Sequence, residues 1–354
     1  MSELRTMIVA SVRRLCEQHC TAATIAAAEQ GVFPADLWKH LAEAGVFHLL
    51  VGTEDGGVGA TIADTAAALS VLGGFAVPGP VVESVVANLA RTAVGLAAID
   101  APQSLAFAAA SAQVDQPATE LSDVRWGKAL GGIVIARRCG DGTSLSMVDP
   151  SDVRLDTVSS LSGEPMAAMT IAGPDLDQIR SSTDIATLRN IVALGRCAEA
   201  VGAIKWMLES CLRHVDERSQ FGRPIGRFQA VQQMLAEMGA HVAAAGTICN
   251  AACELADDGD WTLVSPAVVR IVGAVDRSVA IAHQIHGAIG FSREHGLNLR
   301  TRRAMQWCDD AYLLHDWSAE LGERLIAPEA SLWEWLVPAG GDDPALLSRD
   351  WRPN

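Results

Sequence analysis

The chain has 354 residues, of which 49% are hydrophobic, so it is long enough for two or three domains with sizeable cores. Its formal net charge of -15 argues against nucleic acid as the main partner, because phosphate recognition needs a basic face. No run of about 18 apolar residues free of charge appears, which argues against a membrane span. Composition therefore predicts a globular protein that binds neither nucleic acid nor membranes.

Eight cysteines are scattered along the chain without a CxxC pair, so neither a zinc site nor a disulfide framework is predicted. The start of the chain, MSELRTMIVASVRRL, places acidic and basic side chains around a short apolar run, which is not typical of a signal peptide. A reducing cytoplasm is the location that fits both features best.

Residues 1–100 are predicted to form a small helical domain. Helical spacing bounded by glycine and proline, such as Gly31 and Pro34, recurs four times, over residues 3–30, 34–45, 61–74 and 78–95. The glycine-rich stretch at residues 56–59 is interpreted as a connection between helices, with a phosphate loop as the alternative.

The character of the chain changes near residue 101 and again near residue 185. Short β-branched or alternating runs, separated by turn residues, predict a compact β-domain over residues 101–184. These runs lie at residues 104–111, 131–138, 143–149, 153–159 and 166–172. Helical spacing then predicts a bundle of four long antiparallel helices over residues 185–328, followed by a polar tail at 329–354. The predicted fold class is mainly α with a small β-domain.

The most informative segment is ERSQFGRPIGRFQAVQQMLAEM, residues 217–238, between two helices of the bundle. Arg218 offers a planar fork of donors that suits a pyrophosphate, Phe221 offers an apolar face, and Gln229 offers an amide at the first turn of a helix. Taken by themselves, the arginines of this region fit a solvated basic face equally well; they are Arg213, Arg218, Arg223 and Arg227.

This segment resembles a motif of the acyl-CoA dehydrogenase family, in which Arg, Phe and Gln at these spacings contact the pyrophosphate and adenosine of FAD across a dimer interface. A second segment, HQIHGAIGF at residues 283–291, resembles the family's Gln-Ile-x-Gly-Gly-x-Gly-Phe stretch. The resemblance implies that Gln284 and Gly287 meet the ADP part of FAD, although the family's second glycine is Ala288 here. Residues 37–74 resemble the family's N-terminal helical domain.

The resemblance spans nearly the whole chain and implies the acyl-CoA dehydrogenase fold. This fold has an N-terminal α-domain, a middle β-domain, which looks shortened here, and a C-terminal four-helix bundle that binds FAD. His283 and His286 stand three residues apart on a predicted helix and could in principle bind a metal ion. The sequence offers them no carboxylate or cysteine partner nearby, so no metal site is predicted.

The sequence lacks the family's catalytic glutamate. In the family this glutamate removes the α-proton of an acyl thioester while the flavin takes the β-hydride. Matching Arg303 and Ala304 to the family's Arg-Asp-Ala places the usual position at Ala311. The less common position falls near Val192 or Ala193 when Gly202 is matched to the family's helix glycine. None of these side chains can act as a base, so no catalytic residue is predicted in this chain.

Two nearby acids remain as alternative bases. Asp310 lies beside the lost position, but its side chain is one methylene shorter than glutamate and would need a shifted backbone. Glu199 lies on the first bundle helix, in RCAEAVG. The middle domain departs from the family as well, because ASAQVDQPATELSDVRWG, residues 110–127, replaces the Thr-Glu-Pro and Gly-Ser-Asp that line the flavin ring.

Loss of the base and of the flavin-ring motif, with the ADP-end motif kept, is expected of a subunit that completes another subunit's site. In this respect the chain resembles the short non-catalytic subunit of heteromeric (α2β2) acyl-CoA dehydrogenases of actinobacterial steroid side-chain breakdown. The resemblance implies a partner subunit that supplies the glutamate. It also implies a bulky acyl-CoA substrate, such as a steroid side-chain CoA, and an electron-transfer flavoprotein as a possible electron acceptor.

Two other functions stay open from the sequence alone. A self-sufficient homo-oligomeric dehydrogenase, or a flavin enzyme of altered chemistry, would use Asp310 or Glu199 as its base. A structural or scaffolding homologue would have lost the flavin, which conflicts with the intact Arg218, Phe221 and Gln229.

Overall fold

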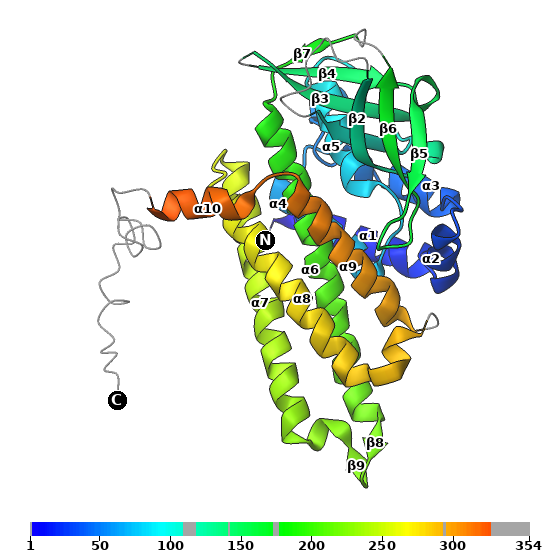
Figure 1. Cartoon of the computed structure of the whole chain (residues 1–354), viewed down its shortest axis with the longest axis vertical. Helices are drawn as coiled ribbons and strands as arrows, with labels where there is room; N and C mark the ends of the chain where they lie inside the picture. The colour runs from blue at the N-terminus through cyan, green and yellow to red at the C-terminus, as the bar shows by residue number, and fades with distance from the viewer. Residues whose placement is uncertain (1, 109–117, 141, 173–176, 293–294, 327–354) are drawn as a thin grey trace.

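The computed structural model describes residues 2–108, 118–140, 142–172, 177–292 and 295–326. The helices of the N-terminal part and two small sheets lie at one end of the molecule, and a bundle of long helices extends away from them (Figure 1). The order of elements, helices followed by strands and then by helices, confirms the predicted fold class. The predicted tail at 329–354 lies outside the described residues.

Five helices make up the N-terminal part: α1 Glu3–His19, α2 Ala22–Glu29, α3 Ala35–Glu43, α4 Ile62–Phe75 and α5 Val81–Thr92. The single helix predicted over residues 3–30 is wrong, because the chain breaks into α1 and α2 near Cys20. Thr21 starts α2 there, since its hydroxyl accepts a hydrogen bond from the backbone N–H of Thr24 at 3.1 Å. The glycine-rich stretch lies in the connection between α3 and α4, as predicted.

The strands of the middle part form two small sheets. The strands are β1 Gln103–Phe107, β2 Ala118–Arg125, β3 Gly132–Cys139, β4 Gly142–Val148, β5 Arg154–Val158, β6 Met166–Ala172 and β7 Ile179–Ser181. One sheet has the order β1-β3-β4-β7 and the other β2-β6-β5. Among the described strands of these sheets, the β1–β3 pair is parallel and the other pairs are antiparallel. The sequence analysis missed β2, because the polar run ATELSDVR has no alternating apolar pattern and is a strand through its pairing with β6.

The C-terminal bundle consists of α6 Ile185–Glu217, α7 Gln229–Asp257, α8 Val264–His286 and α9 Gly296–Leu313, followed by α10 Trp317–Ile326. The four long helices confirm the predicted number of bundle helices. The longest, α6, spans about 50 Å and is buried along much of its length against α4, α8 and α9. Over the described part of the chain, no helix is long and apolar enough to cross a membrane.

The crossing of α4 over α6 joins the N-terminal helices to the bundle, and glycines make it close. A Cβ atom built on Gly202 of α6 would lie 1.8 Å from the backbone oxygen of Ser70 in α4. A Cβ atom on Gly73 would lie 2.0 Å from the backbone oxygen of Glu199. Backbone atoms cannot move aside as a flexible side chain can, so both positions require glycine while the helices keep this distance.

We expect Gly202→Ala to destabilise the chain by roughly 3 kcal/mol, because the added methyl group must separate α4 from α6. The measurement is the free energy of unfolding in urea. Gly239→Ala is the matched control, since a Cβ atom at this helical position of α7 meets nothing within 4 Å. The control should be neutral or about 0.5–1 kcal/mol more stable. Equal stability of Gly202→Ala and the wild type would contradict the close crossing.

Candidate functional site

The first group of predicted cofactor residues lies at the tip of the bundle, where α6 gives way to α7. Arg218 follows the last residue of α6 as its C-cap, and its backbone N–H donates to the carbonyl of His214 at 2.9 Å. A two-residue hairpin follows, with Ser219–Gln220 (β8) paired to Arg223–Pro224 (β9). The Arg218 side chain is exposed, and no acidic side chain forms an ion pair with it within the part of the chain that the structure describes.

Phe221 occupies the turn of this hairpin in a strained and exposed conformation. Its φ angle is 52° and that of Gly222 is 79°, the pair of positive values that a two-residue hairpin turn requires. A bulky aromatic residue rarely adopts a positive φ, and such strain is typical of functional sites. The ring is 91% exposed, so its own chain leaves it available to a ligand or a partner.

Gln229 is the first residue of α7 and is exposed, so it lies at the same tip as the hairpin. Phe228 precedes it as the N-cap, and the guanidinium of Arg223 lies 4.3 Å from the centre of the Phe228 ring. The Phe221 and Phe228 rings meet edge to face at 6.2 Å. Arg218, Phe221 and Gln229 therefore share one exposed end of the bundle, the end farthest from the sheets (Figure 1).

The second group of predicted cofactor residues lies where α8 ends. Gln284 is exposed in the last turn of α8, and Gly287 caps the helix with a φ of 63° and a ψ of -143°, a combination that only glycine adopts readily. A Cβ atom on Gly287 would meet nothing within 4 Å, so open space lies above this backbone. Ile289 and Phe291, in the next turn, are 52% and 65% exposed.

A cluster of histidines brings the two groups to the same end of the bundle. The rings of His214 in α6 and His286 in α8 stack with their centres 4.5 Å apart. The Nε2 atom of His286 lies 3.3 Å from the hydroxyl of Ser210, and its ring meets that of His295 at 4.9 Å. His214 is one turn before Arg218, and His286 directly precedes Gly287, so this contact positions both groups.

The same cluster explains His283 and His286 without a metal ion. The Nε2 atom of His283 pairs with the hydroxyl of Thr301 at 3.2 Å, whereas the Nδ1 atom of His286 pairs with the carbonyl of Ala282 at 2.9 Å. Burial lowers the pKa of both imidazoles, so both are neutral at pH 7. Among the described residues, no group of three or more His, Cys, Asp or Glu side chains is arranged to hold a metal ion.

The positions that would carry the family's catalytic glutamate are closed. Ala311 in α9 is fully buried, and its carbonyl accepts a hydrogen bond from the indole N–H of Trp317 at 2.8 Å. Val192 and Ala193 in α6 are buried as well, at 7% and 0% exposure. These three positions have neither a carboxylate nor exposure to solvent.

A cluster of buried charges fills the space beside Ala311. We call it the central ion cluster; its members are Glu83, Arg125, Arg196, Glu199 and Asp310, which come from α5, β2, α6 and α9. The Arg196 guanidinium pairs with both Glu83 and Glu199, and the Arg125 guanidinium pairs with both Asp310 and Glu83. The two arginines are 2% exposed or less, so their guanidinium groups are shielded from solvent.

The central ion cluster makes both alternative bases poor. Asp310 is held by Arg125 and by the amide of Gln306, which donates to it at 2.8 Å. Glu199 accepts a hydrogen bond from Arg196 at 2.6 Å and is only 2% exposed, so its carboxylate is shielded from solvent. Sequence reasoning missed Glu83, Arg125 and Arg196; the one available signal was a charged residue inside an apolar run, such as Arg196 in IVALGRCAEAVG.

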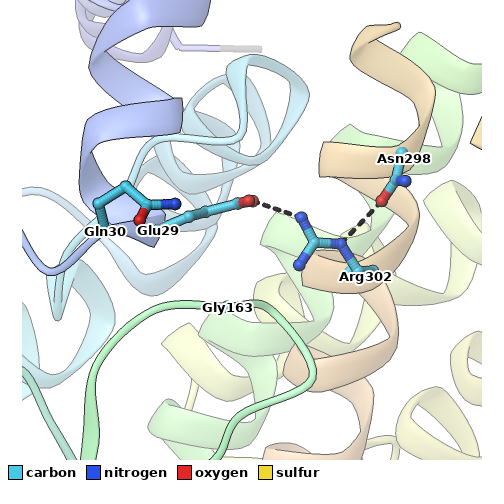
Figure 2. A pocket seen from close by; sticks show the side chains of 5 residues that line it. All are labelled: Glu29, Gln30, Gly163, Asn298 and Arg302. Atoms are coloured by element: carbon cyan, nitrogen blue, oxygen red, sulfur yellow. Dashed lines mark hydrogen bonds and ion pairs between the residues drawn. The ribbon is translucent and has the colours of Figure 1, made fainter. Parts of the chain in front are cut away.

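A second set of ion pairs joins the three parts of the chain nearby. The buried carboxylate of Glu164 accepts hydrogen bonds from Arg303 and from the indole of Trp126, both at 2.9 Å. Arg302 lines a polar cavity of about 390 Å³ beside them. Figure 2 shows that Arg302 bonds to Glu29 of α2 on one side and to Asn298 of α9 on the other. This cavity is bounded by structural ion pairs, not by the predicted site residues.

Two family models match the chain. The model of the acyl-CoA dehydrogenase N-terminal domain matches residues 2–102, and the model of the acyl-CoA dehydrogenase C-terminal domain matches residues 187–307. Among curated proteins, the chain is 28% identical to acyl-CoA dehydrogenase IpdE2 of Mycobacterium tuberculosis, over 94% of this chain and 98% of that protein. It is 31% identical to acyl-CoA dehydrogenase FadE34 of the same organism, over 76% of this chain but only 40% of that longer protein.

Solved structures share the fold. A chain of the ChsE4-ChsE5 complex from Mycobacterium tuberculosis has a TM-score of 0.79 at 20% identity, covering 93% of this chain and 99% of the other. A chain of the Tcur3481-Tcur3483 steroid ACAD has a TM-score of 0.74 at 21% identity, covering 90% and 96%. PigA, solved with FAD and proline, has a TM-score of 0.74 at 18% identity, covering 92% and 97%.

The buried Glu199 gives the chain a specific dependence of stability on pH. Burial raises the pKa of the Glu199 carboxyl from 4.5 to about 7, against the opposing effect of the Arg196 guanidinium. The folded chain therefore binds this proton more readily than the unfolded chain, and it loses stability as pH rises from about 4.5 to about 7. We expect Glu199→Gln to remove this loss, so its stability relative to the wild type should rise across that window.

The measurement is the free energy of unfolding of both proteins at pH 5 and pH 8. Glu217→Gln is the matched control, because Glu217 is an exposed glutamate of the same helix. Its difference from the wild type should change less between the two pH values than that of Glu199→Gln. Parallel pH profiles of Glu199→Gln and the wild type would show that Glu199 is ionised in the folded chain throughout.

Proposed function

Because this chain belongs to the acyl-CoA dehydrogenase family, we propose that it is the non-catalytic subunit of a heteromeric FAD-dependent acyl-CoA dehydrogenase. In this complex, a partner subunit supplies the catalytic glutamate and this chain supplies contacts to the ADP end of the partner's FAD. The reaction is the α,β-desaturation of an acyl-CoA thioester. A bulky acyl group, such as a steroid side chain, is the proposed substrate.

The observation that carries the proposal is the central ion cluster. Desaturation needs an open cleft beside the flavin ring. A carboxylate in this cleft must be able to accept a proton from the substrate. Here the neighbourhood of Ala311, Val192 and Ala193 is instead filled by buried ion pairs. Opening it for a substrate would separate Arg125 and Arg196 from their carboxylates, which is costly in a buried environment. The chemistry is therefore assigned to another subunit.

FAD is the cofactor of the family, and the residues at the tip of the bundle fit its ADP end. Arg218 offers donors to a pyrophosphate, and the exposed ring of Phe221 offers a surface to the adenosine. Gln229, Gln284 and the open backbone at Gly287 complete a polar rim on the same end. When bound, FAD supplies the hydride acceptor, and these residues of the chain would hold and orient its distal end.

The relatives support a heteromeric arrangement. Both ChsE4-ChsE5 and Tcur3481-Tcur3483 pair two proteins, and the latter is a steroid ACAD. FadE34 is about twice as long as this chain, which leaves room for a second module of similar size in one protein. By the same proposal, electrons pass from the complex to an electron-transfer flavoprotein. A cytoplasmic location agrees with eight cysteines that are all free.

Co-expression tests the proposal directly. Produced alone, the chain should retain little FAD, because the contacts at the tip hold only one end of the cofactor. Co-produced with a glutamate-bearing homologue, it should give a yellow complex that oxidises acyl-CoA. Arg218→Met in that complex should weaken FAD retention about tenfold or more, since a charge-assisted pair with a phosphate is lost.

The readout is the flavin absorbance per complex after gel filtration, with Arg14→Met as the matched control. Arg14 is an exposed arginine of α1, a helix that lies well away from the β8–β9 hairpin at the tip of the bundle (Figure 1). Full FAD occupancy of the chain purified alone, together with acyl-CoA oxidation, would overturn the proposal.

Replacement of the nearest alternative base separates this function from a self-sufficient enzyme. We expect Asp310→Asn to leave kcat of the complex within about threefold of the wild type, because Asp310 serves as an ion-pair partner of Arg125. If Asp310 were the base, kcat would fall by about a hundredfold or more. Thermal unfolding in parallel distinguishes loss of the fold from loss of chemistry.

A further inference from the structure

A groove of about 480 Å³ lies on a face of the bundle that the proposed function does not use. Its walls are α1 and α7, and its floor is the close crossing of α4 over α6. None of the cofactor residues at the tip lines it, and neither does any member of the central ion cluster. Its volume is within the range of small-molecule sites, about 300–1,000 Å³.

The middle of the groove is apolar. Small and branched side chains of α4 and α6 form its floor, among them Ala67, Val71, Ala198 and Val201. The floor is shallow because Gly202 brings the two helices together at Ser70. A ligand in this part of the groove would gain from burial of apolar surface and would find few hydrogen-bond partners.

The two ends of the groove differ in charge. Helix α1 runs along α4 in the same direction. Near the start of both helices, Arg5 donates a hydrogen bond to Asp64. At their other end, the Cys20 thiol donates to the carbonyl of Phe75. At the first end, Arg5 is neutralised by Asp64 at 2.7 Å and by Glu254 at 3.4 Å. That end therefore offers no free charge to a ligand.

The other end holds cations without carboxylate partners. Arg13 and Lys205 both line the groove away from Arg5. Arg13 lies two turns beyond Arg5 along α1. The Lys205 amine lies against Gly246 of α7, two turns before Glu254, which pairs with Arg5.

Within the described residues, neither Arg13 nor Lys205 forms an ion pair with an acidic side chain. Glu209 is the acidic residue among the described groove-lining residues; it lies one turn beyond Lys205 and is exposed. Two cations against one solvated carboxylate make this end locally positive in a chain of net charge -15.

A half-buried arginine adds to the positive end. The guanidinium of Arg300 lies 3.7 Å from the centre of the Trp206 ring, and Trp206 lines the groove. Arg300 donates to the carbonyls of Gly74 and Gly296 and, in the described part of the chain, pairs with no carboxylate. Burial lowers the pKa of Arg300 to about 10, an effect to which the nearby Arg303 and Arg213 contribute. A desolvated cation without a counter-ion favours an anion nearby.

We propose that this groove binds an aliphatic or alicyclic carboxylate, with the carboxylate between Arg13 and Lys205 and the apolar body along α4 and α6. The carboxylate would pair with the cations of Arg13 and Lys205, and the apolar body would pack against the apolar floor of the groove. The ligand is thus an organic acid of intermediate size, bound at a site remote from the flavin contacts. The proposal does not depend on the subunit role.

Calorimetric titration of the full-length chain with sodium decanoate, below its micelle concentration, tests the proposal. Decanoate should bind with one-to-one stoichiometry, and the uncharged 1-decanol should bind at least about tenfold more weakly. Arg13→Gln combined with Lys205→Gln should weaken decanoate binding about tenfold or more. Ala67→Trp, which fills the floor, should abolish it.

Arg14→Gln is the matched control, because Arg14 is an exposed neighbour of Arg13 that does not line the groove, and it should bind decanoate like the wild type. Unchanged thermal unfolding of each variant shows that the fold is kept. The proposal is overturned by the absence of saturable heat, by equal binding of decanol, or by binding that the groove variants do not change. If decanoate gives no heat and the groove variants also fail to assemble with a partner protein, the groove is instead a binding site for a helix of that partner.

Discussion

Two guanidinium groups, those of Arg125 and Arg196, lie almost fully buried where the N-terminal helices, the strands and the bundle meet. A charge that is removed from water in this way must be matched by an opposite charge, and the match must come from whatever elements are close. Here Glu83 comes from α5, Glu199 from α6 itself, and Asp310 from α9. The requirement for an opposite charge beside each guanidinium group thus fixes the positions of four elements relative to one another. The same requirement closes the space beside Ala311.

The two ends of the bundle consequently differ in whether their charged side chains are paired within the chain. Near the sheets, the charged side chains of the central ion cluster pair with one another inside the protein. At the far tip, Arg218 has no carboxylate partner among the described residues, and Phe221 is held exposed by a strained hairpin turn. Both groups are among those that we propose to contact the FAD of a partner subunit.

The α4–α6 crossing has a similar double consequence. Gly73 and Gly202 let the helices approach to backbone contact, which joins the N-terminal helices firmly to the bundle. The same closeness leaves a shallow apolar floor between α1 and α7, because small residues at a crossing cannot fill the space above it. The glycines that allow close packing of α4 against α6 therefore also create the groove. The cations at one end of the groove favour a ligand that carries a negative charge.

The sequence by itself determined the order of helices, strands and bundle, since hydrophobic spacing and the Gly and Pro stops are local signals. It also identified the residues proposed for the ADP end, because Arg218, Phe221 and Gln229 lie within twelve residues of one another. It did not reveal β2, whose strand conformation depends on pairing with β6. Nor did it reveal the central ion cluster, since Glu83 and Asp310 are separated by more than two hundred residues. Only the tertiary structure brings such distant charges within contact, because burial and pairing of charge are properties of the packed chain and not of any segment.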